Sequence, residues 1–440
     1  AQLRLAELYS GIGGVANDPE ARFNWLLAAA EQGDMGASYA LADAYLRGNG
    51  VEASRRQALF WFETAAAADY EDAAWRLVQL LNSPDSKGDN KDGYREYLKM
   101  AADKDNADAA LLYAQFILEN GGTDSSVALA MPYLEKAIEA GNLAAMFEMA
   151  GLLANEGLAV HAPEKSLVLY ENAARSGYLE AQLLLGAIYG NPDTAIYDPQ
   201  RAFGFYSAAA RQNHPEGLFQ RADMLLKGRG TGANFPAAAQ DLMRAAEQGY
   251  APAQFTLAGL YGEGKGIERS DALALQWLHA AAGQGYDPAF FPLGVRLLAD
   301  ANSPDETQKA LSWFEGAASN NEADAQYALS KIYFTGDGVP ADNIRAERYL
   351  IAAAENGLAE AQYDYASRLI EKGADSKVVA PFIIAAAEQG FAPAFKQAGL
   401  YLRDGQGIAS DAQKAAFFFK QAGDNGDARS QLETAYNFDK

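Results

Sequence analysis

Apolar residues return along this chain with a fixed spacing, and residues 253–288 show the repeating unit most clearly. Apolar side chains at Phe255, Leu257 and Tyr261 have the scatter of a short buried helix and lack the strict alternation of a strand. A Gly-x-Gly turn follows, in which the missing Cβ atoms allow the chain to reverse. A second apolar cluster then predicts a second helix. The pattern begins near residues 1, 37, 73, 109, 145, 181, 217, 253, 289, 325, 361 and 394, with starts 36 residues apart except for one step of 33.

Polar residues mark the predicted start of each second helix. Seventeen residues after each repeat start, allowing for a three-residue deletion in repeat eleven, ten of twelve positions hold Ser, Asp or Asn. Their side-chain oxygens can accept hydrogen bonds from the otherwise unpaired N–H groups of the first helical turn. These twelve predicted N-cap positions are Asp18, Ser54, Asn90, Ser126, Ala162, Asp198, Asn234, Ser270, Glu306, Asp342, Asp375 and Asp411.

The predicted end of each second helix is equally regular. All twelve stop positions hold Gly, Asn or Asp, the residues that most readily adopt the left-handed conformation that closes a helix. An alanine four residues before each stop predicts a close approach of two helix axes. One turn earlier an aromatic residue recurs in ten repeats, with Leu169 and Asp241 as the exceptions. The stop residues are Gly33, Asp69, Asp105, Gly141, Gly177, Asn213, Gly249, Gly285, Asn321, Gly357, Gly390 and Gly426.

A fixed period of this length is typical of a solenoid, in which each unit buries its apolar face against its neighbours. The frame runs through residues 1–440 without a Pro/Ser/Gly-rich linker, and residues 430–440 form part of a further unit. We therefore expect one continuous all-α domain.

The string A-x-x-L-G/A-x-L-Y-x-x-G-x-G-V/I, followed by A-x-x-W and A-A-x-x-G, resembles the Sel1-like repeat, a relative of the tetratricopeptide repeat. The match is clearest in residues 37–72, 253–288 and 325–360. The resemblance implies a right-handed α/α superhelical solenoid of about twelve helix-turn-helix repeats. It also implies an adaptor or scaffold, since many proteins of this family serve as such in bacterial cell envelopes. A weaker resemblance is to the outer-membrane lipoprotein scaffold of alginate secretion.

The charge balance restricts the class of partner. A net charge of −22 repels nucleic acid and anionic lipid headgroups, and it favours protein partners that carry basic patches. The chain has no cysteine, which excludes disulfides and zinc–thiolate sites. The longest apolar run, residues 378–387, is far shorter than the roughly 20 residues that cross a bilayer.

Candidate catalytic and metal-binding residues do not form a known motif. The three histidines, His161, His214 and His279, lie in different repeats and match neither a Ser-His-Asp arrangement nor H-E-x-x-H. Residues 85–96 are loosely similar to a calcium loop, but Lys87 stands at a ligand position and Asn90 replaces the turn glycine. We therefore expect no enzyme activity, no cofactor and no metal site.

The variable polar positions of the first helices are the candidates for recognition. In solenoids of this type the first helices line the concave face, which offers an extended groove. The fourth and seventh positions of the repeats hold polar residues that differ from one repeat to the next. The aromatic third position is instead expected to belong to the core. The predicted partner-binding residues are Asp43, Arg76, Gln79, Gln115, Glu148, Gln220, Asp223, Lys331 and Asp364, and Arg4 and Glu7 occupy the same two positions in repeat one.

Together these features favour a protein–protein interaction scaffold in the periplasm or at the outer membrane, where it would support exopolysaccharide secretion or assembly. A cytoplasmic or secreted location stays open. We expect a signal peptide or lipid anchor upstream of Ala1, since the sequence begins inside a helix without a methionine. The alternatives are a secreted effector that binds host proteins and a carbohydrate-binding module with exposed aromatic rings.

Overall fold

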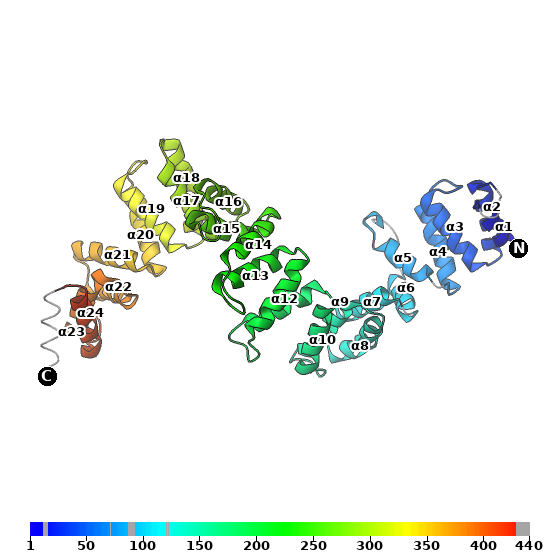
Figure 1. The fold of residues 1–440 in the computed structure, drawn as a ribbon, viewed down its shortest axis with the longest axis horizontal. Helices are drawn as coiled ribbons and strands as arrows, with labels where there is room; N and C mark the ends of the chain where they lie inside the picture. The colour runs from blue at the N-terminus through cyan, green and yellow to red at the C-terminus, as the bar shows by residue number, and fades with distance from the viewer. Residues whose placement is uncertain are drawn as a thin grey trace. The chain divides into compact units, whose positions relative to one another are not determined.

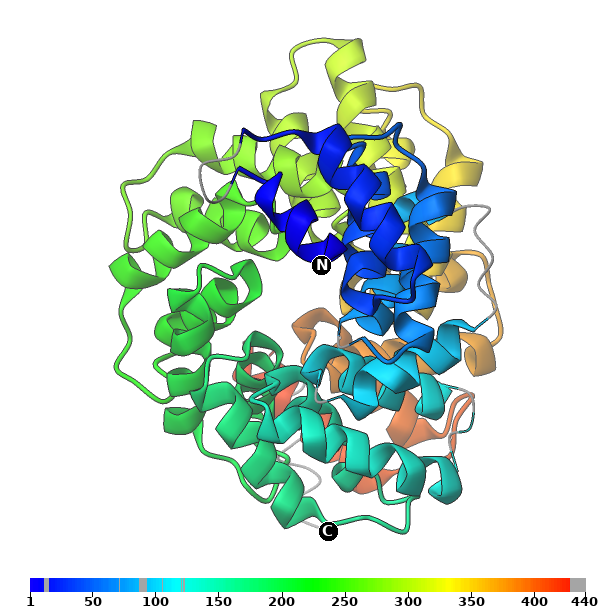
Figure 2. The ribbon, with the colours of Figure 1, turned by 90° about the vertical axis from the view of Figure 1, so that its right-hand side faces the viewer.

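The computed structural model describes residues 1–11, 16–70, 72–86, 93–104, 106–119, 121 and 123–427. It forms two compact units, Ala1–Ala209 and Ala210–Lys440. Every regular element of the described residues is helical, with 24 α-helices and two short 3-10 helices, which confirms the all-α repeat fold. Within each unit, successive helices pack as hairpins (Figures 1 and 2). That residues 1–440 form one continuous domain stays a prediction.

The first unit contains the helices of repeats one to six, and the boundary falls in the last turn of α12. Its elements are α1 (Gln2–Leu8), α2 (Pro19–Glu31), α3 (Met35–Arg47), α4 (Arg55–Ala67), α5 (Ala73–Leu81), η1 (Pro84–Ser86), α6 (Tyr94–Asp103), α7 (Ala107–Glu119), α8 (Asp124–Glu139), α9 (Leu143–Ala154), α10 (Pro163–Arg175), α11 (Leu179–Gly190) and α12 (Pro199–Arg211).

The second unit contains the helices of repeats seven to twelve. Its elements are α13 (Pro215–Lys227), α14 (Phe235–Glu247), α15 (Ala251–Glu263), α16 (Asp271–Gly283), η2 (Asp287–Ala289), α17 (Phe290–Asp300), α18 (Pro304–Ser319), α19 (Ala323–Thr335), α20 (Asn343–Glu355), α21 (Ala359–Glu371), α22 (Ser376–Glu388), α23 (Ala392–Asp404) and α24 (Ala412–Asp424).

Most predicted N-caps are confirmed. Eight accept hydrogen bonds from first-turn N–H groups, namely Asp18, Ser54, Asp198, Asn234, Ser270, Asp342, Asp375 and Asp411. Ala162 precedes α10 without a side-chain cap, as its methyl group requires. Asn90 lies outside the described residues.

Two predicted N-caps are wrong, because a better cap occurs earlier in the chain. Helix α8 begins at Asp124 and is capped by Thr123, and the Ser126 hydroxyl accepts from the Thr123 N–H at 2.9 Å in a reciprocal capping box. Helix α18 begins at Pro304 and is capped by Ser303. Glu306 then accepts from the Asn302 N–H at 2.7 Å, so both predicted residues lie inside the first turn.

The predicted stops and close contacts are confirmed. Every stop residue other than Asp105, which lies outside the described residues, has a positive φ, from 60° at Asn213 to 99° at Gly177. The alanine four residues before each stop is at most 5% exposed in all twelve repeats. A larger side chain at these positions would therefore overpack the contact between helices.

A ladder of buried glutamines, which the sequence analysis missed, joins successive repeats. The second residue of four repeats donates through Nε2 to a carbonyl near the end of the preceding second helix, at 2.9–3.2 Å. These residues are Gln182, Gln254, Gln326 and Gln362. The amide oxygen of Gln326 also accepts from Asn356 Nδ2 at 2.9 Å. Each amide thus satisfies backbone groups that burial would otherwise leave unpaired.

Repeat seven shows why Asp241 breaks the aromatic series. Asp241 is only 4% exposed and accepts from Arg221 Nε at 2.6 Å and from Arg221 Nη2 at 2.5 Å. Arg221 occupies the fifth position of its repeat, where other repeats hold apolar residues such as Leu41, Leu185 and Leu257. A bidentate ion pair between α13 and α14 therefore replaces an apolar contact.

Candidate recognition face

We define the first-helix face by the fourth, seventh and eleventh positions of each repeat, which lie on or just after its first helix. All nine predicted partner-binding residues lie on first helices and are exposed or half-buried. They are therefore accessible, as a recognition role requires. Which of them contact a partner stays a prediction.

Several of these residues hold neighbouring first helices together. Gln115 Nε2 on α7 donates to Glu148 Oε1 on α9 at 2.6 Å. The Tyr327 hydroxyl on α19 donates to Asp364 Oδ2 on α21 at 2.6 Å, and burial followed by this hydrogen bond raises the pKa of Tyr327. The Lys331 ammonium lies 4.2 Å from the centroid of the Tyr327 ring. These four predicted residues have a structural role in addition to any role in binding.

Asp223 has local partners, because its carboxylate lies 2.7 Å from Lys227 Nζ and 2.6 Å from Arg229 Nη2. Asp43 likewise pairs with Arg47 at 3.0 Å on α3. Gln220, which is half-buried on α13, forms no hydrogen bond through its side chain among the described residues of the second unit.

Three predicted residues come together in a groove of about 470 Å³ between α3 and α5, which we call the polar groove. Asp43, Arg76 and Gln79 line it. The sequence analysis did not include the other lining residues, which are Arg22, Tyr39, Ala40, Arg47, Asp72 and Trp75. Arg76 Nη1 donates to Gln79 Oε1 at 3.1 Å. The polar groove thus combines guanidinium, carboxylate and amide groups with two aromatic rings.

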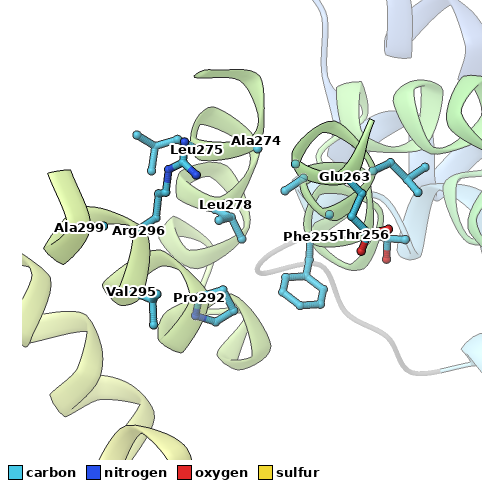
Figure 3. Close-up of a pocket in the computed structure, with 14 residues that line it drawn as sticks. Phe255, Thr256, Glu263, Ala274, Leu275, Leu278, Pro292, Val295, Arg296 and Ala299 are labelled. Carbon is cyan, nitrogen blue, oxygen red and sulfur yellow. The ribbon is translucent and has the colours of Figure 1, made fainter. Parts of the chain in front are cut away.

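A second groove of about 650 Å³, the apolar groove, lies on the same kind of face in the second unit. It is formed by α15 and α17, with α16 behind them (Figure 3). Leu275 and Leu278 of α16 lie opposite Phe255 of α15, and Pro292 and Val295 of α17 complete the wall. Thr256, Glu263, Arg296 and Ala299 also line it.

The apolar groove exists because α17 leaves part of α16 uncovered. Leu278 is half-buried, whereas the equivalent residues Leu242, Phe314 and Leu350 are at most 1% exposed. Phe314, for example, belongs to a buried cluster with residues of the following first helix, including Leu329. At α16 the following first helix does not close this contact, so apolar surface is left open.

The lining of the apolar groove could have been found from the sequence. The fourth and seventh positions, polar in many repeats, hold Thr256 and Gly259 on α15 and Pro292 and Val295 on α17. Val295 is 46% exposed. The sequence analysis searched these positions for long polar side chains and therefore missed repeats eight and nine, in which they are small or apolar.

Charged residues, mostly acidic, lie around the rim of the apolar groove. Arg296 lies 3.3 Å from Asp271 Oδ2 and 3.7 Å from Asp300 Oδ2. The hydrogen bond from Arg296 lowers the pKa of Asp271 below its usual value. Glu263 is exposed on the opposite rim.

The aromatic third positions pack as expected for core residues. The Tyr39 ring centroid lies 5.1 Å from that of Phe62 and 5.0 Å from that of Tyr70. Phe147 packs in the same way on Tyr170 at 5.1 Å. All eight rings at this position are half-buried, an arrangement that favours packing over the stacking of sugars.

The large rise in the pKa of Tyr189 has a structural explanation. The Tyr189 hydroxyl donates to Glu171 Oε1 at 2.7 Å, and the Arg201 guanidinium lies 4.0 Å from the Tyr189 ring centroid. Burial and then the hydrogen bond to Glu171 raise the pKa of Tyr189 to about 12. Burial acts to raise the pKa of Glu171, but hydrogen bonds from Tyr189 and Arg201 hold it below its usual value.

The same cluster recurs at the equivalent positions of the second unit, where the tyrosine hydroxyl donates to a glutamate at 3.1 Å and accepts from an arginine at 3.3 Å. Its members are Glu315, Tyr333 and Arg345. Recurrence in the repeat frame favours a role in packing over catalysis.

Among the described residues, no group of three or more His, Asp or Glu side chains could hold a metal ion. His161 and His279 are exposed, and His214 precedes α13. Residues 87–92 of the calcium-like loop lie outside the described residues. No helix within the described ranges is long and apolar enough to span a membrane.

Comparisons with known proteins find similar solved structures. A solved protective antigen of uropathogenic Escherichia coli with an SLR fold is 24% identical, with a TM-score of 0.64 over 94% of this chain and 81% of that one. A Sel1 repeat protein from Oxalobacter formigenes is 25% identical, with a TM-score of 0.45 over 80% of this chain and 91% of that one. No curated protein sequence matched.

The family model for the Sel1 repeat matches most of the chain. It covers residues 1–34, 36–70, 107–142, 143–178, 179–214, 215–250, 251–286, 303–322, 323–358 and 397–427. It leaves residues 287–302, which contain α17 of the apolar groove, unmatched. The chain therefore belongs to the Sel1 repeat family.

Proposed function

We propose that this chain is a non-enzymatic scaffold whose first-helix face binds segments of partner proteins. Proteins built from Sel1 repeats generally act as protein-interaction scaffolds. The observation that carries the proposal is the apolar groove, because open apolar surface bounded by charged residues is typical of an interaction site. Its volume of about 650 Å³ lies in the range that is typical of ligand-binding pockets in proteins.

The partner segment would insert apolar side chains between α15 and α17. Basic residues beside that segment would face Glu263 on the rim, and the net charge of −22 would attract them from a distance. The cluster of a tyrosine, a glutamate and an arginine recurs at equivalent positions of the repeat frame, which supports a scaffold without an active site.

We also propose that the protein works in the periplasm or at the outer membrane, where it supports exopolysaccharide secretion or assembly. The resemblance of its repeats to envelope proteins of this family supports the proposal. Fractionation of the source cells, followed by detection with an antibody, tests the location. Recovery in the cytoplasmic fraction alone would contradict it, and recovery in the medium would favour the effector alternative.

Site-specific photocrosslinking tests the scaffold itself. A benzoylphenylalanine residue at Val295 should crosslink to one defined envelope protein, whereas the same residue at Leu129, which is exposed on α8, should not. Thr256→Arg, on the opposite wall of the groove, should abolish the Val295 crosslink by blocking entry. A crosslink that persists in Thr256→Arg, or that also forms at Leu129, would show that the groove is not the binding site.

A further inference from the structure

The polar groove gathers positive charge in a strongly acidic protein. Three arginines from three helices line it: Arg22 from α2, Arg47 from α3 and Arg76 from α5. Two carboxylates, Asp43 and Asp72, also line the groove, so guanidinium groups are in excess. The whole chain carries −22, which makes this local excess unusual.

Arg22 departs from the repeat frame at a position that is alanine in most repeats, with Tyr94, Ser166 and Val379 as the other exceptions. Eight other repeats hold alanine there, at Ala58, Ala130, Ala202, Ala238, Ala274, Ala310, Ala346 and Ala415. Most of these alanines are fully buried between helices, so a long cation has no packing reason to stand there. Arg22 is instead half-buried and contributes to the wall of the polar groove.

Within the described part of the first unit, two of the three guanidinium groups form no ion pair with a carboxylate. Arg47 Nε is paired with Asp43 Oδ1 at 3.0 Å. The polar contact of Arg76 is with the neutral amide of Gln79, at 3.1 Å. No ion pair of Arg22 is formed with any residue in the described part of the first unit. Arg22 and Arg76 therefore retain donors that fit the planar oxygens of a carboxylate.

The aromatic side of the polar groove suits a peptide. Trp75 is half-buried and lines the groove beside Arg76, so it offers an apolar surface next to the cationic donors. A segment that alternates acidic and apolar side chains would use both. A long polyanion fits less well, because Asp43 and Asp72 flank the groove and the net charge repels it.

We propose that the polar groove binds a short acidic segment of a partner protein, with Arg22 and Arg76 holding its carboxylates and Trp75 contacting its apolar side chain. This inference rests on the proposed scaffold function and names the chemistry of one partner segment. The net negative charge acts on a partner's basic surfaces over long distances, whereas the groove selects an acidic segment at contact distance.

Fluorescence anisotropy with a labelled peptide of sequence Glu-Glu-Leu-Glu-Glu-Leu tests the proposal on the full chain. We expect saturable binding that weakens as salt rises, and no comparable binding of the matched peptide in which Gln replaces Glu. Arg22→Ala and Arg76→Gln should each weaken binding about tenfold or more, since each removes a charge-assisted contact. Arg22→Ala introduces the residue that most repeats already hold, so folding should be retained.

Arg4→Gln is the matched control, because Arg4 occupies the fourth position of repeat one, as Arg76 does in repeat three, but lies outside the groove. It should change the affinity less than twofold. Equal binding of the Glu and Gln peptides, or unchanged affinity in both groove variants, would overturn the proposal. Tighter binding of tetragalacturonate that displaces the peptide would assign the groove to an acidic polysaccharide instead. Failure here leaves the Val295 crosslink unaffected, so it is distinguishable from failure of the scaffold proposal.

Discussion

The buried ion pair of repeat seven can be exchanged for the apolar pair that other repeats use. Arg221 and Asp241 stand at positions that hold Leu185 and Phe205 in repeat six. If the pair replaces that apolar contact, Arg221→Leu combined with Asp241→Phe should restore it. Each single substitution should instead leave one charge without its bidentate partner and next to an apolar neighbour.

The size of the effect follows from burial. Asp241 is 4% exposed and receives two short hydrogen bonds from Arg221, so Arg221→Leu leaves a buried carboxylate whose remaining cationic neighbour, Arg244, lies 4.0 Å away. Breaking such a pair typically costs about 3–5 kcal/mol, whereas replacing both partners by well-packed apolar residues is often neutral or stabilising. We therefore expect a large coupling energy between the two sites.

Urea unfolding followed by circular dichroism measures this coupling, together with hydrogen exchange of residues 215–247. Hydrogen exchange is needed because repeats can unfold locally, so a single global transition need not report on repeat seven. Each single variant should lose amide protection in α13 and α14, and the double variant should regain it. Arg229→Leu, which removes a more exposed partner of Asp223, serves as the control and should have a small effect. A double variant as unstable as the worse single variant would refute the exchange.

Three further predictions concern the packing between repeats. Gln326→Ala should destabilise its repeat by about 1–3 kcal/mol, because the buried Ala318 carbonyl and the Asn356 amide lose their partner; faster hydrogen exchange in α18 and α19 is the measurement. Ala317→Leu should cost about 1–3 kcal/mol by overpacking, and an unchanged melting temperature would contradict the close helix contact. The raised pKa of Tyr189 favours the protonated, folded form, so its stabilising contribution should be complete below about pH 10 and lost as pH rises toward 12. Tyr189→Phe should remove that component of alkaline unfolding, and an identical pH profile would count against it.

The fold was predictable because the residues that begin and end the helices recur in every repeat. Left-handed stops and buried alanines occur in register through the chain, and a repeated local signal compensates for ambiguity in any one unit. The two wrong N-caps arise where the turn itself changes. Thr123 and Ser303 provide earlier caps than the frame predicts, and a fixed offset cannot anticipate that choice.

The candidate site was predictable only in part, because the frame gives a residue's face but not its neighbours. Asp43, Arg76 and Gln79 were placed on the correct helices and do converge in the polar groove. Gln115 and Glu148 were also placed on the correct helices, but their side chains bond to each other between neighbouring repeats. A sequence position cannot distinguish a donor that faces a partner from one that faces the next helix.

Departures from the repeat frame therefore carry more functional information than the variable polar positions. A residue that matches the frame is explained by packing, so selection for folding alone accounts for it. A compensated departure, such as Arg221 with Asp241, is also explained by packing, since each residue satisfies the other. An uncompensated departure needs another reason. Arg22 stands at a position that holds alanine in eight other repeats, and no carboxylate in the described part of its unit pairs with it. Val295, an exposed apolar residue at a position that is polar in many repeats, belongs to the same class, and both residues line grooves on the first-helix face.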